Sequence, residues 1–291
     1  MKTIRIIIVL TMVLFAMPCP AQQYAFMVLS SKGLTEVKSG EQWTSIKVGA
    51  QLKTTDEVKI PGNGYLGLVH ASGKTLQVKE SGNYKVVDLV SKVGNGSNAL
   101  NKYTDFILSS EQEKKNKLAA TGAVHRNVKK DIMLGLPSDP AKAELLGDHF
   151  LLTWTADGSS SYKITVTDFH GDELASYDVA GNSHMIDLSK GFENTPQILV
   201  KITSSNQNTS DSYTVKKLTG HRNKKMNEAV SELGLSTETT GLDKFILASF
   251  FEDKLMLIDA LTAYKEAAEM EPDVYQEVYD QFLVRFGFNP N

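Results

Sequence analysis

The sequence predicts a multidomain protein of mixed β and α structure. Two runs of short apolar segments broken by turn residues, over about 25–89 and 132–218, predict two β domains. Apolar residues at three- and four-residue steps from Met226 onward predict a helical end. The length of 291 residues, with 41% apolar and 22% charged residues, suits two or three domains with ordinary cores. The expected parts are an export signal over 1–21, an all-β domain over 22–90, a linker with an amphipathic helix over 91–130, a β-sandwich over 131–220 and a helical module over 221–291.

Composition excludes two broad classes. The chain has 31 Lys and Arg against 34 Asp and Glu, a net charge of −3, which disfavours a dedicated nucleic-acid binder. Beyond the first 20 residues no apolar run approaches the ~20 residues that cross a bilayer, so we expect no transmembrane span in the mature chain.

The N-terminus has the pattern of a secretory signal peptide. Lys2 and Arg5 precede an apolar stretch over 6–17, and Ala21 supplies a small residue for cleavage. The alternative, a lipoprotein acylated at Cys19, is disfavoured because small residues do not precede that cysteine. Cys19 is the only cysteine, so the mature chain would have neither a disulfide nor a thiolate site. We expect export to the periplasm or the cell surface.

The N-terminal β domain alternates apolar and polar residues between glycine-containing turns. Its spacing resembles the FecR-type domain of bacterial envelope proteins, which implies an all-β fold. Family members that signal to a sigma factor use a cytoplasmic helix and a transmembrane span, so that function is not carried over to a chain with a cleavable signal. The positions that carry the resemblance are Gly33, Trp43, Ile46, Gly49, Leu52, Asp56 to Val58, Tyr65, Leu68, the turn at Ser72 and Gly73, Leu76 and Val78.

Three residues of this domain are candidates for partner binding or for structure. We expect Trp43 to be a core or edge anchor, with a ligand platform as the alternative. Asp56 stands before a strand and is expected to cap a turn, with acid catalysis as the alternative. Tyr65 is a candidate through the resemblance alone.

The linker over 91–130 begins with a polar, glycine-containing stretch. Leu100, Tyr103, Phe106 and Ile107 then recur at helical spacing, which predicts an amphipathic helix. The basic segment 122–130 could dock an anionic surface, although such short stretches are usually only solvated.

The second β region predicts a sandwich of seven strands. Leu152 to Trp154, followed by Tyr162 to Val166, resembles the second and third strands of fibronectin type III domains, which implies an immunoglobulin- or fibronectin-like fold with Trp154 in the core. Four polar residues in this domain could bind a metal ion. Because the segment ends in a hairpin turn, however, we expect these residues to form the turn instead. This polar cluster consists of Asp168, His170, Asp172 and Glu173. The predicted strands are 132–136, 150–154, 161–169, 173–178, 184–188, 197–203 and 212–218.

The helical module contains the spacing of one tetratricopeptide repeat, a helix pair with small residues at the crossing. Phe251, Ala260 and Tyr264 are the candidate binding or structural residues. A docking module for a partner and a purely structural cap both remain open, because one repeat does not form the groove of a stacked array. The matching positions are Leu247, Ala248, Phe251, Ala260, Tyr264, Ala267 and Pro272, with a final helix over 274–286.

No catalytic constellation is evident. The sequence has no His-Glu-x-x-His, no Gly-x-Ser-x-Gly, no phosphate-binding glycine loop and no calcium loop. We therefore expect no enzyme activity, no cofactor and no metal. The expected function is a noncatalytic exported envelope protein that binds or scaffolds a protein partner or a cell-wall polymer. The alternative is a surface glycan-active hydrolase with an unrecognised carboxylate site.

Overall fold

The computed structural model describes residues 24–93, 104, 107–108, 132–137, 139, 142–192, 195–235 and 239–288. These residues form four β-sheets and five helices, which confirms the predicted class of multidomain β plus α. The expected signal peptide with Cys19, the basic segment 122–130 and most of the linker helix lie outside the described residues.

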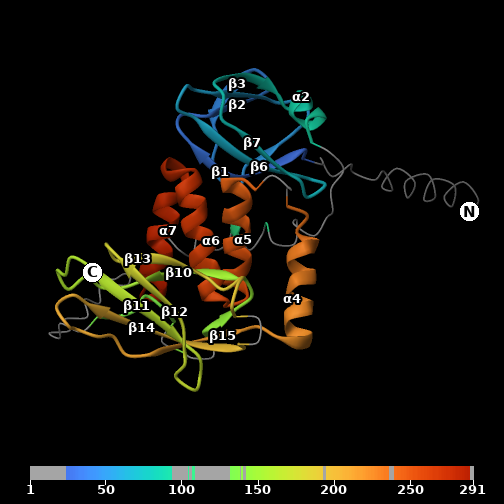
Figure 1. The fold of residues 1–291 in the computed structure, drawn as a ribbon. Coiled ribbons are helices and arrows are strands. Elements are labelled where there is room, and N and C mark those ends of the chain that lie inside the picture. The colour runs from blue at the N-terminus through green and yellow to red at the C-terminus, as the bar shows by residue number, and fades with distance from the viewer. Residues whose placement is uncertain are drawn as a thin grey trace, which may run out of the picture.

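Two four-stranded sheets around one core form the N-terminal β domain (Figure 1). Their strand orders are β4-β1-β6-β7 and β3-β2-β5-β8. Val58 and Ile60 enter the core whereas Glu57 and Lys59 face outward, so the alternation in the sequence sets the two faces. The elements are β1 (Phe26–Lys32), β2 (Glu36–Ser39), β3 (Gln42–Ser45), β4 (Gln51–Leu52), β5 (Glu57–Ile60), β6 (Tyr65–His70), β7 (Thr75–Val78), β8 (Gly82–Lys85) and the short helix α2 (Val86–Ser91).

The second β domain packs a five-stranded sheet, in the order β12-β11-β14-β15-β9, against the pair β10-β13. Trp154 is fully buried in its core and meets the ring of Tyr162 edge-on at 5.5 Å, as expected. The predicted strand over 132–136 contributes only an isolated bridge, from Leu134 to Trp154. The strands are β9 (Glu144–Leu145), β10 (His149–Thr153), β11 (Tyr162–Thr167), β12 (Glu173–Val179), β13 (Ser183–Asp187), β14 (Gln197–Ser204) and β15 (Tyr213–Lys217).

Four helices follow, and local signals set several of their ends. Thr240 and Asp243 form a reciprocal capping box at the start of α5. Pro272 occupies the first turn of α7, and Gly287 ends that helix in the left-handed conformation at φ 70°. The helices are α4 (Gly220–Glu232), α5 (Gly241–Asp253), α6 (Leu257–Met270) and α7 (Pro272–Phe286).

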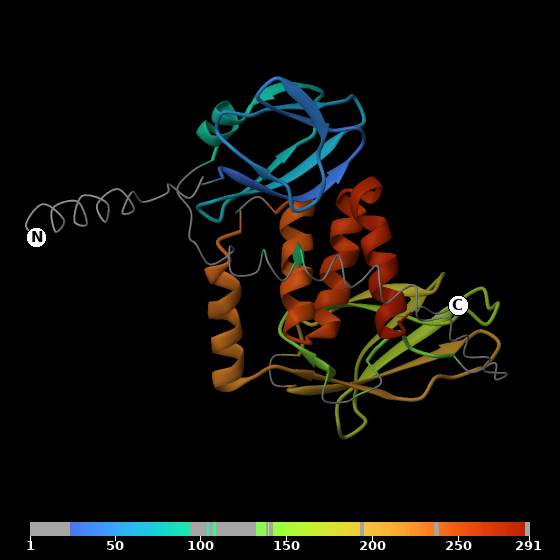
Figure 2. The ribbon, with the colours of Figure 1, turned by 180° about the vertical axis from the view of Figure 1, so that it is seen from behind.

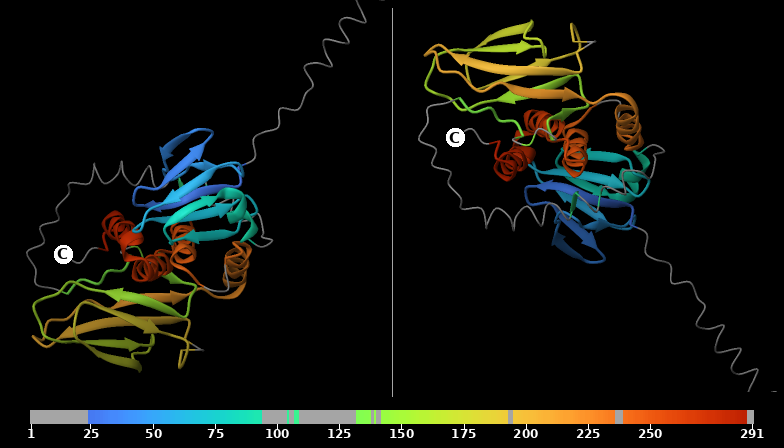
Figure 3. Two further views of the ribbon diagram at one scale, coloured as in Figure 1. Left: turned by 90° about the horizontal axis from the view of Figure 1, so that it is seen from above. Right: turned by 90° about the horizontal axis from the view of Figure 1, so that it is seen from below.

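Helices α5, α6 and α7 lie between the two β domains (Figures 1 and 2). Views from above and below show them end-on, with one β domain on either side (Figure 3). A single hydrophobic cluster joins these helices to Leu29 of β1, to Leu151 of β10 and to the fully buried Ile107 of the linker. The helical module therefore packs directly against both β domains. This packing covers most of the apolar side chains of α5, α6 and α7, whereas Met270 and Val284 stay exposed.

Gly67 of β6 allows the N-terminal β domain to approach α5 closely. A Cβ at this position would collide with Ser30 Oγ and lie 3.1 Å from the Leu242 side chain of α5. The missing side chain thus leaves room for the helix against the sheet.

Candidate functional site

Trp43 lies on the outer face of the sheet β3-β2-β5-β8. Its side chain is 37% exposed, and all four residues of β3 are exposed. The expected core position is therefore wrong: β3 is an edge strand, and no further layer covers this face within the described part of the chain. The edge position remains, and it leaves Trp43 partly open to solvent.

Charged and polar side chains surround Trp43 on that face. Lys38 stands directly opposite it in β2. The Nζ atom of Lys59 lies 6.0 Å from the centroid of the indole ring and 3.5 Å from Glu36 Oε2. Strand register places two rows of side chains on this outer face. The first row consists of Trp43, Lys38, Glu57 and Lys85. The second row consists of Ser45, Glu36, Lys59 and Asn83.

Asp56 is buried and belongs to a turn. Its carboxylate accepts hydrogen bonds from Lys53 N at 2.8 Å and Ser39 Oγ at 3.0 Å. Both contacts hold the chain that leads into β5. This is the geometry of a turn-capping carboxylate.

Tyr65 belongs to a buried group of hydroxyls where β1 and β6 meet α7. Its hydroxyl donates to Gln77 Oε1 at 3.0 Å and lies 2.9 Å from the hydroxyl of Tyr275, which is 3.1 Å from Ser30 Oγ. Burial raises the pKa of both tyrosines well above the usual value, so both hydroxyls keep their protons. Tyr65 therefore joins the β domain to α7, and its partner Tyr275 was not foreseen from the sequence.

The three candidates in the helical module are interior residues. Phe251 is 7% exposed, and Ala260 and Tyr264 are not exposed at all. The Tyr264 hydroxyl donates to Glu252 Oε2 at 2.7 Å, and Arg285 donates to the same carboxylate at 2.8 and 2.9 Å. None of the three candidates reaches Trp43, and none presents a surface to a partner.

Helix α6 carries a row of polar side chains along strand β10 and the loop before it. Asp259 accepts hydrogen bonds from the backbone N–H groups of Leu146 and Gly147, both at 2.9 Å. Thr262 Oγ1 accepts from Leu151 N at 3.0 Å. Burial raises the pKa of Asp259 to about 6 although the two backbone donors oppose the rise. Spacing at 259, 262 and 266 signals one helix face, but nothing in the sequence indicates a strand as its partner.

His149, Glu266 and Lys244 continue this polar contact. His149 Nε2 lies 3.2 Å from Glu266 Oε1, and Lys244 Nζ lies 2.6 Å from Glu266 Oε2. The hydrogen bond with Glu266 is the largest cause that raises the pKa of His149, to about 9. Burial would raise the pKa of Glu266, but its hydrogen bonds with His149 and Lys244 outweigh burial and lower it.

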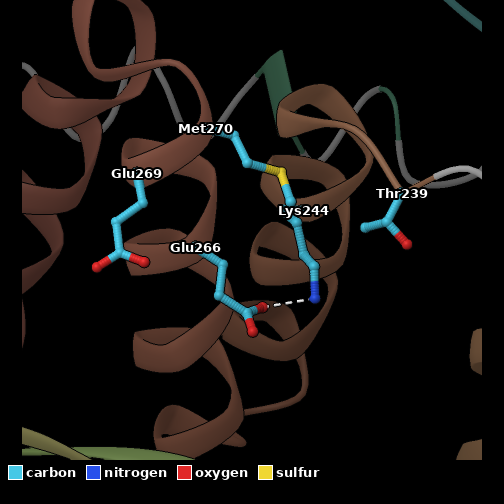
Figure 4. A pocket seen from close by; sticks show the side chains of 5 residues that line it. All are labelled: Thr239, Lys244, Glu266, Glu269 and Met270. Atoms are coloured by element: carbon cyan, nitrogen blue, oxygen red, sulfur yellow. Dashed lines mark ion pairs between the residues drawn. The ribbon is translucent and has the colours of Figure 1, made fainter.

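A pocket of about 460 Å³ opens beside this ion pair (Figure 4). It holds two carboxylates of α6, Glu266 and Glu269, but both oxygens of Glu266 are already held and its pKa is lowered. Hydrolysis of a glycosidic bond needs a carboxylic acid that keeps its proton near neutral pH. Glu266 therefore does not support the hydrolase alternative. The lining residues are Thr239, Lys244, Glu266, Glu269 and Met270.

The polar cluster at the β11–β12 connection is a turn. Asp168 Oδ1 accepts hydrogen bonds from His170 N at 2.8 Å and Asp172 N at 2.9 Å. Among the residues that the structure describes, no group of three or more His, Cys, Asp or Glu could hold a metal ion. In the same part of the chain, no helix has the length and apolar character needed to cross a membrane.

Comparison with known proteins adds little. No family model and no curated protein matches the chain. A region covering 30% of the chain is similar, at 16% identity and a TM-score of 0.23, to two solved structures. One is the complex of the Porphyromonas gingivalis RgpB pro- and mature domains, and the other is the Arg-specific cysteine proteinase gingipain R. The match covers 19% and 18% of those chains, and at this TM-score it carries no functional argument.

Proposed function

We propose that this protein is a noncatalytic, exported component of the bacterial envelope that binds a protein partner or a cell-wall polymer. In this proposal the N-terminal domain is FecR-type, the second β domain is immunoglobulin- or fibronectin-like, and α5 with α6 is a single tetratricopeptide-like hairpin. A signal peptide cleaved after Ala21 would deliver the chain to the periplasm or the cell surface.

The exposure of Trp43 is the observation that carries the proposal. In the described part of the chain, Trp43 and Phe169 are the exposed large aromatic side chains, and Trp43 is the one within a strand. Tryptophan on a surface combines a large apolar area with few rotatable bonds, which favours it in binding sites. The other candidate residues are buried, so they support a scaffold that holds the outer faces of the β domains in place.

Binding by the mature chain, 22–291, tests the proposal. We expect cosedimentation with purified cell-wall sacculi, or one specific crosslinked protein from envelope membranes, and we expect Trp43→Ala to reduce it. Phe169→Ala, which removes the other exposed aromatic, should leave it unchanged. Failure to retain any wall polymer or envelope protein, or release of reducing ends from the sacculi, would contradict a noncatalytic binding role. The mass of the exported protein should correspond to a chain that begins at Gln22.

A further inference from the structure

The outer face around Trp43 combines an aromatic ring with a small excess of positive charge. It carries three lysines and two glutamates, which are Lys38, Lys59 and Lys85 and Glu36 and Glu57. Among the described residues, Lys59 pairs with Glu36, whereas neither Lys38 nor Lys85 has a carboxylate within the 4.0 Å of an ion pair. Lys38 lies directly across from Trp43, and the Lys59 ammonium lies 6.0 Å from the ring. The face therefore offers an indole ring with the Lys59 ammonium over it and Lys38 beside it on the neighbouring strand.

A sugar ring that carries a carboxylate matches this arrangement. The C–H groups on one face of a pyranose can stack on the negative face of the indole ring, while its hydroxyls stay at the rim. A carboxylate on the sugar ring can then pair with Lys38, which has no carboxylate partner among the described residues. Lys85 lies three strand spacings from Trp43, about 14 Å, which suits a chain of several sugars better than a single one.

A protein partner fits this face less well. A specific protein interface buries roughly 800 Å² on each side and has an apolar centre. On the two rows of this face, Trp43 is the one large apolar side chain, and its seven neighbours there are charged or polar.

We propose that the outer face of β3-β2-β5-β8 binds an acidic polysaccharide, with Trp43 stacking on a pyranose ring and Lys38 pairing with its carboxylates. This inference rests on the proposed function and names the class of ligand.

Polygalacturonate and its fully methyl-esterified form test this proposal, because the two polymers differ in charge but share the same sugar rings. The mature chain should bind the acidic polymer more tightly at low ionic strength, and the difference should shrink at about 0.5 M salt. Trp43→Ala should weaken binding of both polymers about five- to tenfold. Lys38→Ala should weaken binding of the acidic polymer alone, about threefold. Lys163→Ala, on the exposed face of β11, is the matched charge control and should change neither affinity.

Because Trp43 and Lys38 lie outside the core, the variants should keep the thermal unfolding temperature of the wild type. The inference is overturned if Trp43→Ala binds polygalacturonate as well as the wild type does, or if both polymers bind equally. Undiminished binding of Trp43→Ala to sacculi or to a crosslinked protein would also overturn it, while the proposed function would stand. Loss of a crosslinked protein on Trp43→Ala, without any binding of polygalacturonate, would assign the face to a protein instead. If no ligand of any kind is retained, both proposals fail.

Discussion

Replacing Asp259 by Asn should have an effect on stability that changes with pH. The carboxylate is 5% exposed and accepts two backbone hydrogen bonds, from Leu146 and Gly147. Burial raises its pKa from 3.8 to about 6. A pKa that is about 2 higher in the folded state means that the ionised group destabilises the fold by about 3 kcal/mol at neutral pH. Below pH 3.8 the group is protonated in both states and this cost vanishes.

The introduced asparagine side chain would carry no charge, but its amide has one acceptor oxygen for two backbone donors. Leaving one buried N–H without a partner costs about 1–3 kcal/mol at every pH. The Asp259→Asn variant should therefore be less stable than the wild type in acid, and as stable or more stable at neutral pH. Between about pH 4.5 and 8, the free energy of unfolding of the wild type minus that of the variant should fall by about 2 kcal/mol.

Urea unfolding at several pH values, followed by the fluorescence of the buried Trp154, measures this difference. The charge of His149, on the strand that faces α6, acts on Asp259, and Glu266 of the same helix is hydrogen-bonded to His149. Both residues are unchanged in the variant, so their own contribution to the pH dependence largely cancels. A difference between wild type and variant that stays constant with pH would refute the reasoning.

Three further predictions concern the contacts that unite the domains. Tyr65→Phe and Tyr275→Phe should each lower the free energy of unfolding by about 1 kcal/mol. A double-mutant cycle of urea unfolding should show a coupling energy of about 0.5–1.5 kcal/mol between them, and strictly additive effects would contradict their contact. Ala260→Arg places a charged side chain at a fully buried position in the shared cluster, so calorimetry should show the whole chain destabilised; a β domain that keeps its own unchanged melting transition would count against this. Glu252→Gln should lower the free energy of unfolding by about 3–5 kcal/mol, because Arg285 loses its buried partner. Adding Arg285→Met to this variant should recover part of the lost stability in chemical unfolding. If no stability is recovered, the broken ion pair is not the cause of the loss.

The sequence by itself predicts the class of most of the long segments, because strand and helix periods are local properties, although the predicted strand 132–136 forms only an isolated bridge. Alternation around Val58 and Ile60 assigns the inner face of β5. Trp154 is buried, as the resemblance of its segment to fibronectin type III strands implies. The small residue Ala260, singled out by its spacing, is fully buried in the cluster of the helical module. These features depend on neighbours within a few residues.

Only the tertiary structure decides which faces are covered. Trp43 and Tyr65 both lie on strands, yet β3 is an edge strand with an open face while β6 packs against α7. The contact between Asp259 and Gly147 joins residues 112 positions apart, and the one between Tyr65 and Tyr275 joins residues 210 apart. Burial and hydrogen bonding at such positions depend on which elements meet in space, and the local pattern of residues carries no record of that. The sequence alone therefore allows the helical end to be a docking module. In the structure this module lies between the two β domains, so the candidate binding site that stays exposed is the outer face around Trp43.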